Sequence, residues 1–121
     1  MRPESLHEVA HRILLGADKS SAIKEFMDEF RYRKRLGVEI GSMIKQEPEL
    51  TGNALADAYL AGLAESISLD AGVQVPKWVD APARFLADHV VIGGRHSRAS
   101  MLVETPASMR KRRLYCGEVT L

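Results

Sequence analysis

The segment His7-Glu8-Val9-Ala10-His11 places two histidines four residues apart, with a carboxylate between them. On a helix this spacing puts both imidazoles on one face, as in zinc proteases, where the glutamate serves as the general base. Such a site also needs a third ligand downstream, and no histidine or acidic residue stands at a matching distance. A metal-dependent hydrolase using His7, Glu8 and His11 is therefore one hypothesis, and an exposed helix face is the alternative that we favour.

The strongest local pattern is a run of four consecutive cations: Arg110, Lys111, Arg112 and Arg113. The net charge of the chain is only +1, but this value hides an asymmetry. Residues 1–94 hold 11 Lys and Arg against 14 Asp and Glu, whereas residues 95–113 hold six cations and one acid. A local basic patch steers an acidic partner, which can be nucleic-acid phosphates or an acidic groove on a protein. The alternative is a solvated helix face.

Three further features could bear on function. Trp78 is the only tryptophan, and it can either fill the core or anchor a partner, since tryptophan is enriched among interface hot spots. Cys116 is the only cysteine, so it cannot form a disulfide within the chain. Neighbouring arginines could lower its thiol pKa, although a partly buried structural cysteine is the interpretation that we prefer. A second basic cluster consists of Arg31, Arg33, Lys34 and Arg35.

Helical periodicity dominates the first 70 residues. A capping box, Ser5-x-x-Glu8, precedes an apolar stripe and predicts a helix over residues 5–15. A second stripe follows the cap candidates Asp18, Ser20 and Ser21, and predicts a helix that runs through Arg35. We expect a break near Gly37 or Gly41. Residues 54–70 are rich in small residues, mainly alanine with Gly62, which predicts a central buried helix that a neighbouring helix can approach closely.

The pattern changes after Val73, where prolines make a long strand improbable. Short helices are predicted over residues 82–87, over 97–104, and after Thr105 as N-cap with Pro106 at the first position. Residues 89–92 are either a short strand or core filler, and the tail 114–121 should pack back on the domain. We therefore predict an all-α fold: a small bundle of about four main helices plus short C-terminal helices, in a single domain of residues 1–121.

Composition excludes several classes of protein. The chain has 121 residues with 45% hydrophobic and 27% charged residues, close to the average of globular domains. No apolar run reaches the ~18 residues of a membrane span, and the N-terminal residues lack the apolar core of a secretory signal. We expect a cytoplasmic bacterial protein that has no contact with the membrane and requires no cofactor.

The C-terminal half resembles a known family. The segments that carry the resemblance are Glu47-Pro48, Thr51-Gly52, Asp57 to Glu65, Gly72 to Trp78, Ala83 to Leu86 and Leu102 to Tyr115. They resemble an uncharacterised actinobacterial-type domain, which occurs alone or C-terminal to XRE-type helix-turn-helix regulators and is often encoded beside a nucleotidyltransferase. Over roughly residues 45–121, the resemblance implies an antitoxin-like or regulatory partner of a nucleotidyltransferase-type toxin. It implies no catalysis in this chain.

These observations lead to one main prediction and two alternatives. The main prediction is a non-catalytic interaction protein whose partner-binding residues are Trp78, Arg110, Lys111, Arg112 and Arg113. The first alternative is a nucleic-acid-binding protein that uses the basic run, and the second is the metal-dependent hydrolase. A homo-oligomer is compatible with either binding role.

Overall fold

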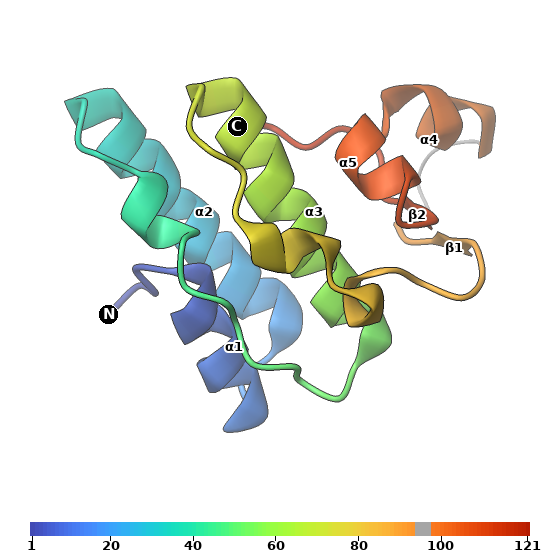
Figure 1. Ribbon diagram of the computed structural model, residues 1–121, viewed down its shortest axis with the longest axis horizontal. Helices are drawn as coiled ribbons and strands as arrows, with labels where there is room; N and C mark the ends of the chain where they lie inside the picture. The colour runs from blue at the N-terminus through green and yellow to red at the C-terminus, as the bar shows by residue number, and fades with distance from the viewer. Residues whose placement is uncertain (94–97) are drawn as a thin grey trace. The chain divides into compact units, whose positions relative to one another are not determined.

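A computed structural model describes residues 1–93 and 98–121, and it is mainly α-helical (Figure 1). The chain contacts fall into two compact units, Met1–Gly52 and Asn53–Leu121. The expectation of a single domain stays a prediction. Among the described residues, no helix combines the length and apolar composition needed to cross a bilayer.

The first unit is built on two helices that pack together, α1 (Leu6–Leu14) and α2 (Lys19–Leu36). Ser5 caps α1 by accepting a hydrogen bond from the Glu8 amide at 3.1 Å, as the capping box predicts. The Glu8 carboxylate completes the cap one residue early, because it accepts from the Glu4 amide at 2.6 Å. The buried apolar side chains of the unit are Leu6, Val9, Ala10, Ala22, Phe26, Met27, Phe30, Met43 and Ile44.

The end of α2 confirms the predicted break. Asp18 caps the helix through the Ser21 amide at 2.9 Å, and Gly37 ends it in the left-handed conformation with φ of 70°. Between the end of α2 and residue 53, the only helical structure is a 3-10 turn, η1 (Gly41–Met43).

The second unit is organised around α3 (Ala54–Ala71), which confirms the helix predicted over residues 54–70. Asn53 caps it through the Ala56 amide at 2.9 Å, and Gly72 ends it at φ of 68°. Within this unit, α3 contacts the turns η2 (Lys77–Asp80) and η3 (Pro82–Arg84), the short helix α5 (Ala107–Arg110) and strand β2 (Leu114–Tyr115). A Cβ on Gly62 would overlap the Met109 thioether, so the small residues of α3 do permit a close approach.

Two of the short elements differ from the predictions. Residues 82–87 form only the 3-10 turn η3, because the chain is extended again at Phe85 and the Leu86 amide bonds to the Arg112 carbonyl. Thr105 does not cap α5. Its hydroxyl instead donates to the Met101 carbonyl at 2.5 Å and accepts from the amides of Cys116 and Gly117.

The remaining elements are α4 (Arg98–Glu104) and a two-stranded parallel sheet of β1 (Val90–Val91) and β2. Of residues 89–92, only Val90 and Val91 form a strand. Ser97, the predicted start of α4, lies outside the described residues. Leu114 is fully buried and pairs with Val90, so the tail packs back on its unit as predicted.

Candidate functional site

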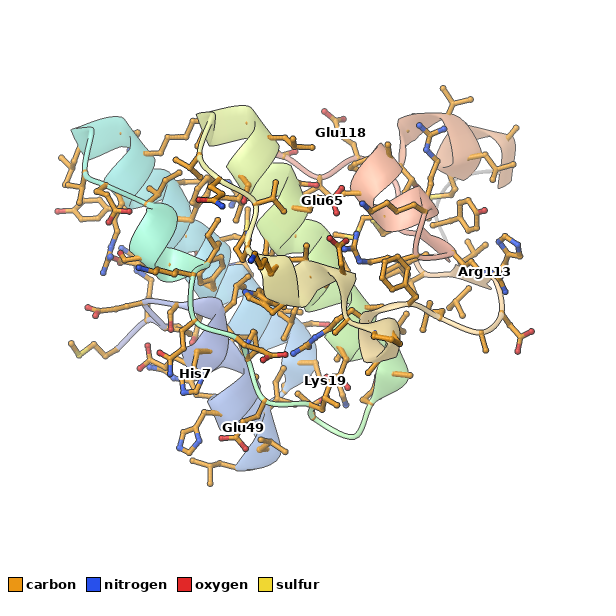
Figure 2. The ribbon with its side chains drawn as sticks, in the orientation of Figure 1. His7, Lys19, Glu49, Glu65, Arg113 and Glu118 are labelled. Carbon is orange, nitrogen blue, oxygen red and sulfur yellow. The ribbon has the colours of Figure 1, made fainter. Side chains whose placement is uncertain are left out.

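Arg112 lies in the interior of the second unit, with no exposed surface. Its guanidinium donates to the Glu65 carboxylate at 3.1 Å, to the Ser108 carbonyl at 2.6 Å and to the Val79 carbonyl at 2.7 Å. Its Cζ stands 4.8 Å from the centroid of the Phe85 ring. Figure 2 shows Glu65 on α3, the helix against which this segment packs. The arginine therefore ties α3, η2 and α5 together from inside, and it contributes nothing to a basic surface.

A second arginine, Arg84, is also fully buried in this unit. Its Nη1 donates to the Asp57 carbonyl at 3.4 Å, and its Cζ lies 5.0 Å from the centroid of the Trp78 ring. Trp78 itself is only 9% exposed. Of the two roles considered for Trp78, its burial agrees with that of a core residue. Both arginines thus lie over aromatic rings, where cation–π attraction adds to their hydrogen bonds.

The basic run leaves three side chains on the surface: Arg110, Lys111 and Arg113. Lys111 Nζ lies 2.7 Å from the Glu65 carboxylate, so one buried acid neutralises part of the run. Arg113 has a φ of 66°, uncommon for a residue with a Cβ, and its side chain donates to the Ala87 carbonyl. Of the other cations in residues 95–113, Arg95 and the side chain of Arg98 lie outside the described part of the structure.

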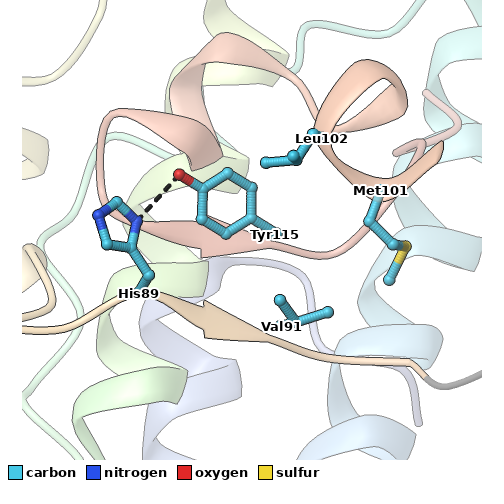
Figure 3. Close-up of a pocket in the computed structure, with 5 residues that line it drawn as sticks. All are labelled: His89, Val91, Met101, Leu102 and Tyr115. Carbon is cyan, nitrogen blue, oxygen red and sulfur yellow. Dashed lines mark hydrogen bonds between the residues drawn. The ribbon is translucent and has the colours of Figure 1, made fainter. Parts of the chain in front are cut away.

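The left-handed turn at Arg113 redirects the chain from α5 into β2, and β2 forms one wall of a pocket. The pocket has a volume of about 350 Å³. We call it the α4 pocket, and Figure 3 shows five described residues that line it: His89, Val91, Met101, Leu102 and Tyr115. Its walls are mostly apolar, and Met101 forms a buried part of them.

One end of the α4 pocket is polar. His89 Nδ1 lies 3.0 Å from the Tyr115 hydroxyl, and the two rings stack with centroids 5.6 Å apart (Figure 3). Neither residue was predicted as part of a site. His89 and Tyr115 form no local sequence motif, because only the pairing of β1 with β2, across 24 residues of the chain, brings them together.

The residues of the proposed metal site serve structural contacts. His7 Nδ1 is 3.2 Å from the Glu47 carbonyl, and the Glu8 carboxylate is engaged by the Glu4 amide and by Arg12 at 3.4 Å. His11 is exposed. Within residues 1–93 and 98–121, no group of three histidine, cysteine or acidic side chains is placed to hold a metal ion.

Cys116 and the second basic cluster have local roles. Burial raises the pKa of the Cys116 thiol, which is opposite to the lowering considered from its neighbouring arginines. In the basic cluster, Arg33 pairs with Glu29 at 2.8 Å and Glu4 at 3.5 Å. Arg31 lies 3.7 Å from Asp28, so ion pairs within the unit neutralise part of the charge of this cluster.

Comparisons with known proteins add no relative: no family model, no curated protein and no solved structure matches the chain. The resemblance of residues 45–121 to the actinobacterial-type domain therefore stays a prediction.

Proposed function

We propose that this protein is a non-catalytic interaction protein that binds a protein partner through the α4 pocket. The observation that carries the proposal is the exposure of the apolar pocket walls. Val91 and Leu102 are 48% and 49% exposed, although both lie beside the hollow that Met101 and Tyr115 line. An apolar hollow with half-exposed walls gains stability when a partner covers it, because apolar surface then leaves water.

We further propose that the partner is a nucleotidyltransferase-type toxin, which the chain holds in an antitoxin-like or regulatory complex. The support is the resemblance of residues 45–121, and the segment Leu102 to Tyr115 that carries part of it also builds the α4 pocket. In this proposal, the segment that resembles the family also forms part of the surface that recognises the partner.

The contacts that the basic run makes within its own unit favour a protein partner over nucleic acid. Nucleic-acid affinity depends on the number of cations that reach phosphates. Arg112 is enclosed, Lys111 is paired with Glu65 and Arg113 donates to the Ala87 carbonyl, so three side chains of the four-residue run already have contacts within the unit. Arg110, Lys111 and Arg113 stay predicted contacts for the partner, whereas Arg112 and Trp78 support the unit from inside.

Co-expression tests the proposal. The chain is produced together with a nucleotidyltransferase-type protein chosen as the candidate partner, and the purified material is run on size-exclusion chromatography with light scattering. We expect co-elution in a stoichiometric complex and relief of any growth defect that the nucleotidyltransferase causes alone. Separate elution of the two proteins, together with an unrelieved growth defect, overturns the proposal.

A further inference from the structure

The two-stranded sheet has a defined pocket face. Successive side chains of a strand alternate between the two faces of the sheet, so His89 and Val91 point to the same side. Val91 pairs in register with Tyr115 of β2, and all three residues line the α4 pocket. Met101 and Leu102 of α4 lie on the same side and close the hollow over that face (Figure 3).

The same strand has an open edge. The Val90 amide donates to the Arg113 carbonyl at 2.8 Å, and the Ile92 amide donates to the Tyr115 carbonyl at 2.9 Å. Because bonding residues alternate along a parallel strand, the N–H and C=O of the intervening Val91 point away from β2. Within the described part of the chain, no further strand pairs with β1. An edge of this kind is a template for a strand from another chain.

From the open edge and the adjoining hollow, we infer that β1 receives an extended apolar segment of the protein partner. The segment adds as a third strand beside Val91, and one of its apolar side chains enters the α4 pocket. This inference rests on the proposed function and specifies its docking mode. The backbone donor and acceptor of Val91 bind the peptide backbone, and the pocket selects the side chain.

The chemistry of the site favours this occupant. Among the described residues that line the pocket there is no lysine or arginine, so these residues offer nucleic-acid phosphates no counter-charge. Among the described lining side chains, the His89–Tyr115 pair supplies the polar groups, and it lies at one end of an apolar wall. An apolar side chain carried on an extended backbone matches both the wall and the polar strand edge.

Two pairs of variants test the docking mode, with binding to the co-expressed nucleotidyltransferase measured by biolayer interferometry. Val91→Pro removes the outward amide, whereas Val91→Ala trims the side chain and keeps that amide. Because the Val91 amide does not bond to β2, proline is compatible with this edge position. We expect Val91→Pro to bind roughly tenfold more weakly than Val91→Ala, the effect of losing one hydrogen bond.

The second pair separates the pocket from the rest of α4. Leu102→Glu places a charge in the pocket wall, and Val103→Glu is its matched control. Val103 is the adjacent residue, is 81% exposed and does not line the pocket. We expect Leu102→Glu to weaken binding on the order of 30-fold or more and Val103→Glu to change it less than about twofold.

The outcomes separate this inference from the proposed function. If Leu102→Glu weakens binding but Val91→Pro binds as tightly as Val91→Ala, the added strand is wrong and the proposed function stands. If the wild-type complex forms but Leu102→Glu binds as tightly as Val103→Glu, the partner does not use the α4 pocket, and the docking mode and the proposed binding surface both fail. If no wild-type complex forms, the proposed function fails, and the docking mode that rests on it fails as well. Should Val91→Pro fail to fold, amide hydrogen exchange on the wild type decides. Slower exchange at Val91 in the complex supports the added strand, and unchanged exchange overturns it.

Discussion

Replacing Arg112 with methionine should destabilise the second unit far more than the same change at its neighbour Arg110. Methionine keeps apolar volume over the Phe85 ring but removes every donor. The Glu65 carboxylate then loses one of its two cations, and the carbonyls of Val79 and Ser108 lose their guanidinium donors. Removing one partner of a buried ion pair costs about 3–5 kcal/mol. Because Lys111 still neutralises Glu65, we expect the lower end, about 3 kcal/mol.

Urea unfolding followed by the fluorescence of Trp78 measures this loss. Trp78 is the only tryptophan and is buried in the second unit, so its emission reports the unfolding of that unit. Arg110→Met is the matched control, because Arg110 is exposed, and its effect should stay within about 0.5 kcal/mol.

A double variant tests the cause of the destabilisation. Glu65→Leu combined with Arg112→Met removes both buried charges, so it should recover about 1 kcal/mol or more relative to Arg112→Met alone. If Arg112→Met is as stable as Arg110→Met, Arg112 does not hold the unit together and the reasoning is refuted.

Three further predictions concern single groups. Thr105→Val should cost about 1–3 kcal/mol, because it strands the amides of Cys116 and Gly117, whereas Thr105→Ser should keep most of the stability in urea unfolding. Hydrogen bonds from the Ser21 amide and hydroxyl lower the pKa of Asp18, so its charge adds stability above the ordinary aspartate pKa of about 3.9. The stability advantage over Asp18→Asn should disappear as the pH falls through the lower folded pKa, and unfolding at a series of pH values checks this. Burial raises the pKa of the Cys116 thiol, so iodoacetamide should alkylate it more slowly at pH 8 than it alkylates glutathione; a faster reaction would contradict that environment.

The helices were predictable because their information is local. Asp18 and Asn53 begin α2 and α3 as N-caps, and Gly37 and Gly72 end them in the left-handed conformation. Caps and left-handed glycines depend on residues within one turn, which a sequence pattern records. Thr105 shows the limit of such patterns, since its hydroxyl bonds to amides 11 and 12 residues away instead of capping α5.

The interior position of Arg112 was not predicted, because four adjacent cations are usually solvated. One sequence feature could have indicated it. Glu65 stands within the most apolar helix of the chain, and a buried acid requires a buried cation. Arg112, which lies one helical turn after Ser108, is that cation. The α4 pocket had no comparable sequence pattern, because His89 and Tyr115 meet only through the pairing of β1 with β2.

The central claim is that the partner binds the α4 pocket, with the surface cations in a secondary role. Calorimetric titration of the nucleotidyltransferase with Leu102→Glu and with the double variant Arg110→Ala/Arg113→Ala tests it most directly. We expect Leu102→Glu to weaken binding on the order of 30-fold or more, whereas the arginine variant stays within about fivefold of wild type, since rim charges mainly affect association rates. Binding that survives Leu102→Glu but is lost in the arginine variant would contradict the account and favour an electrostatic interface.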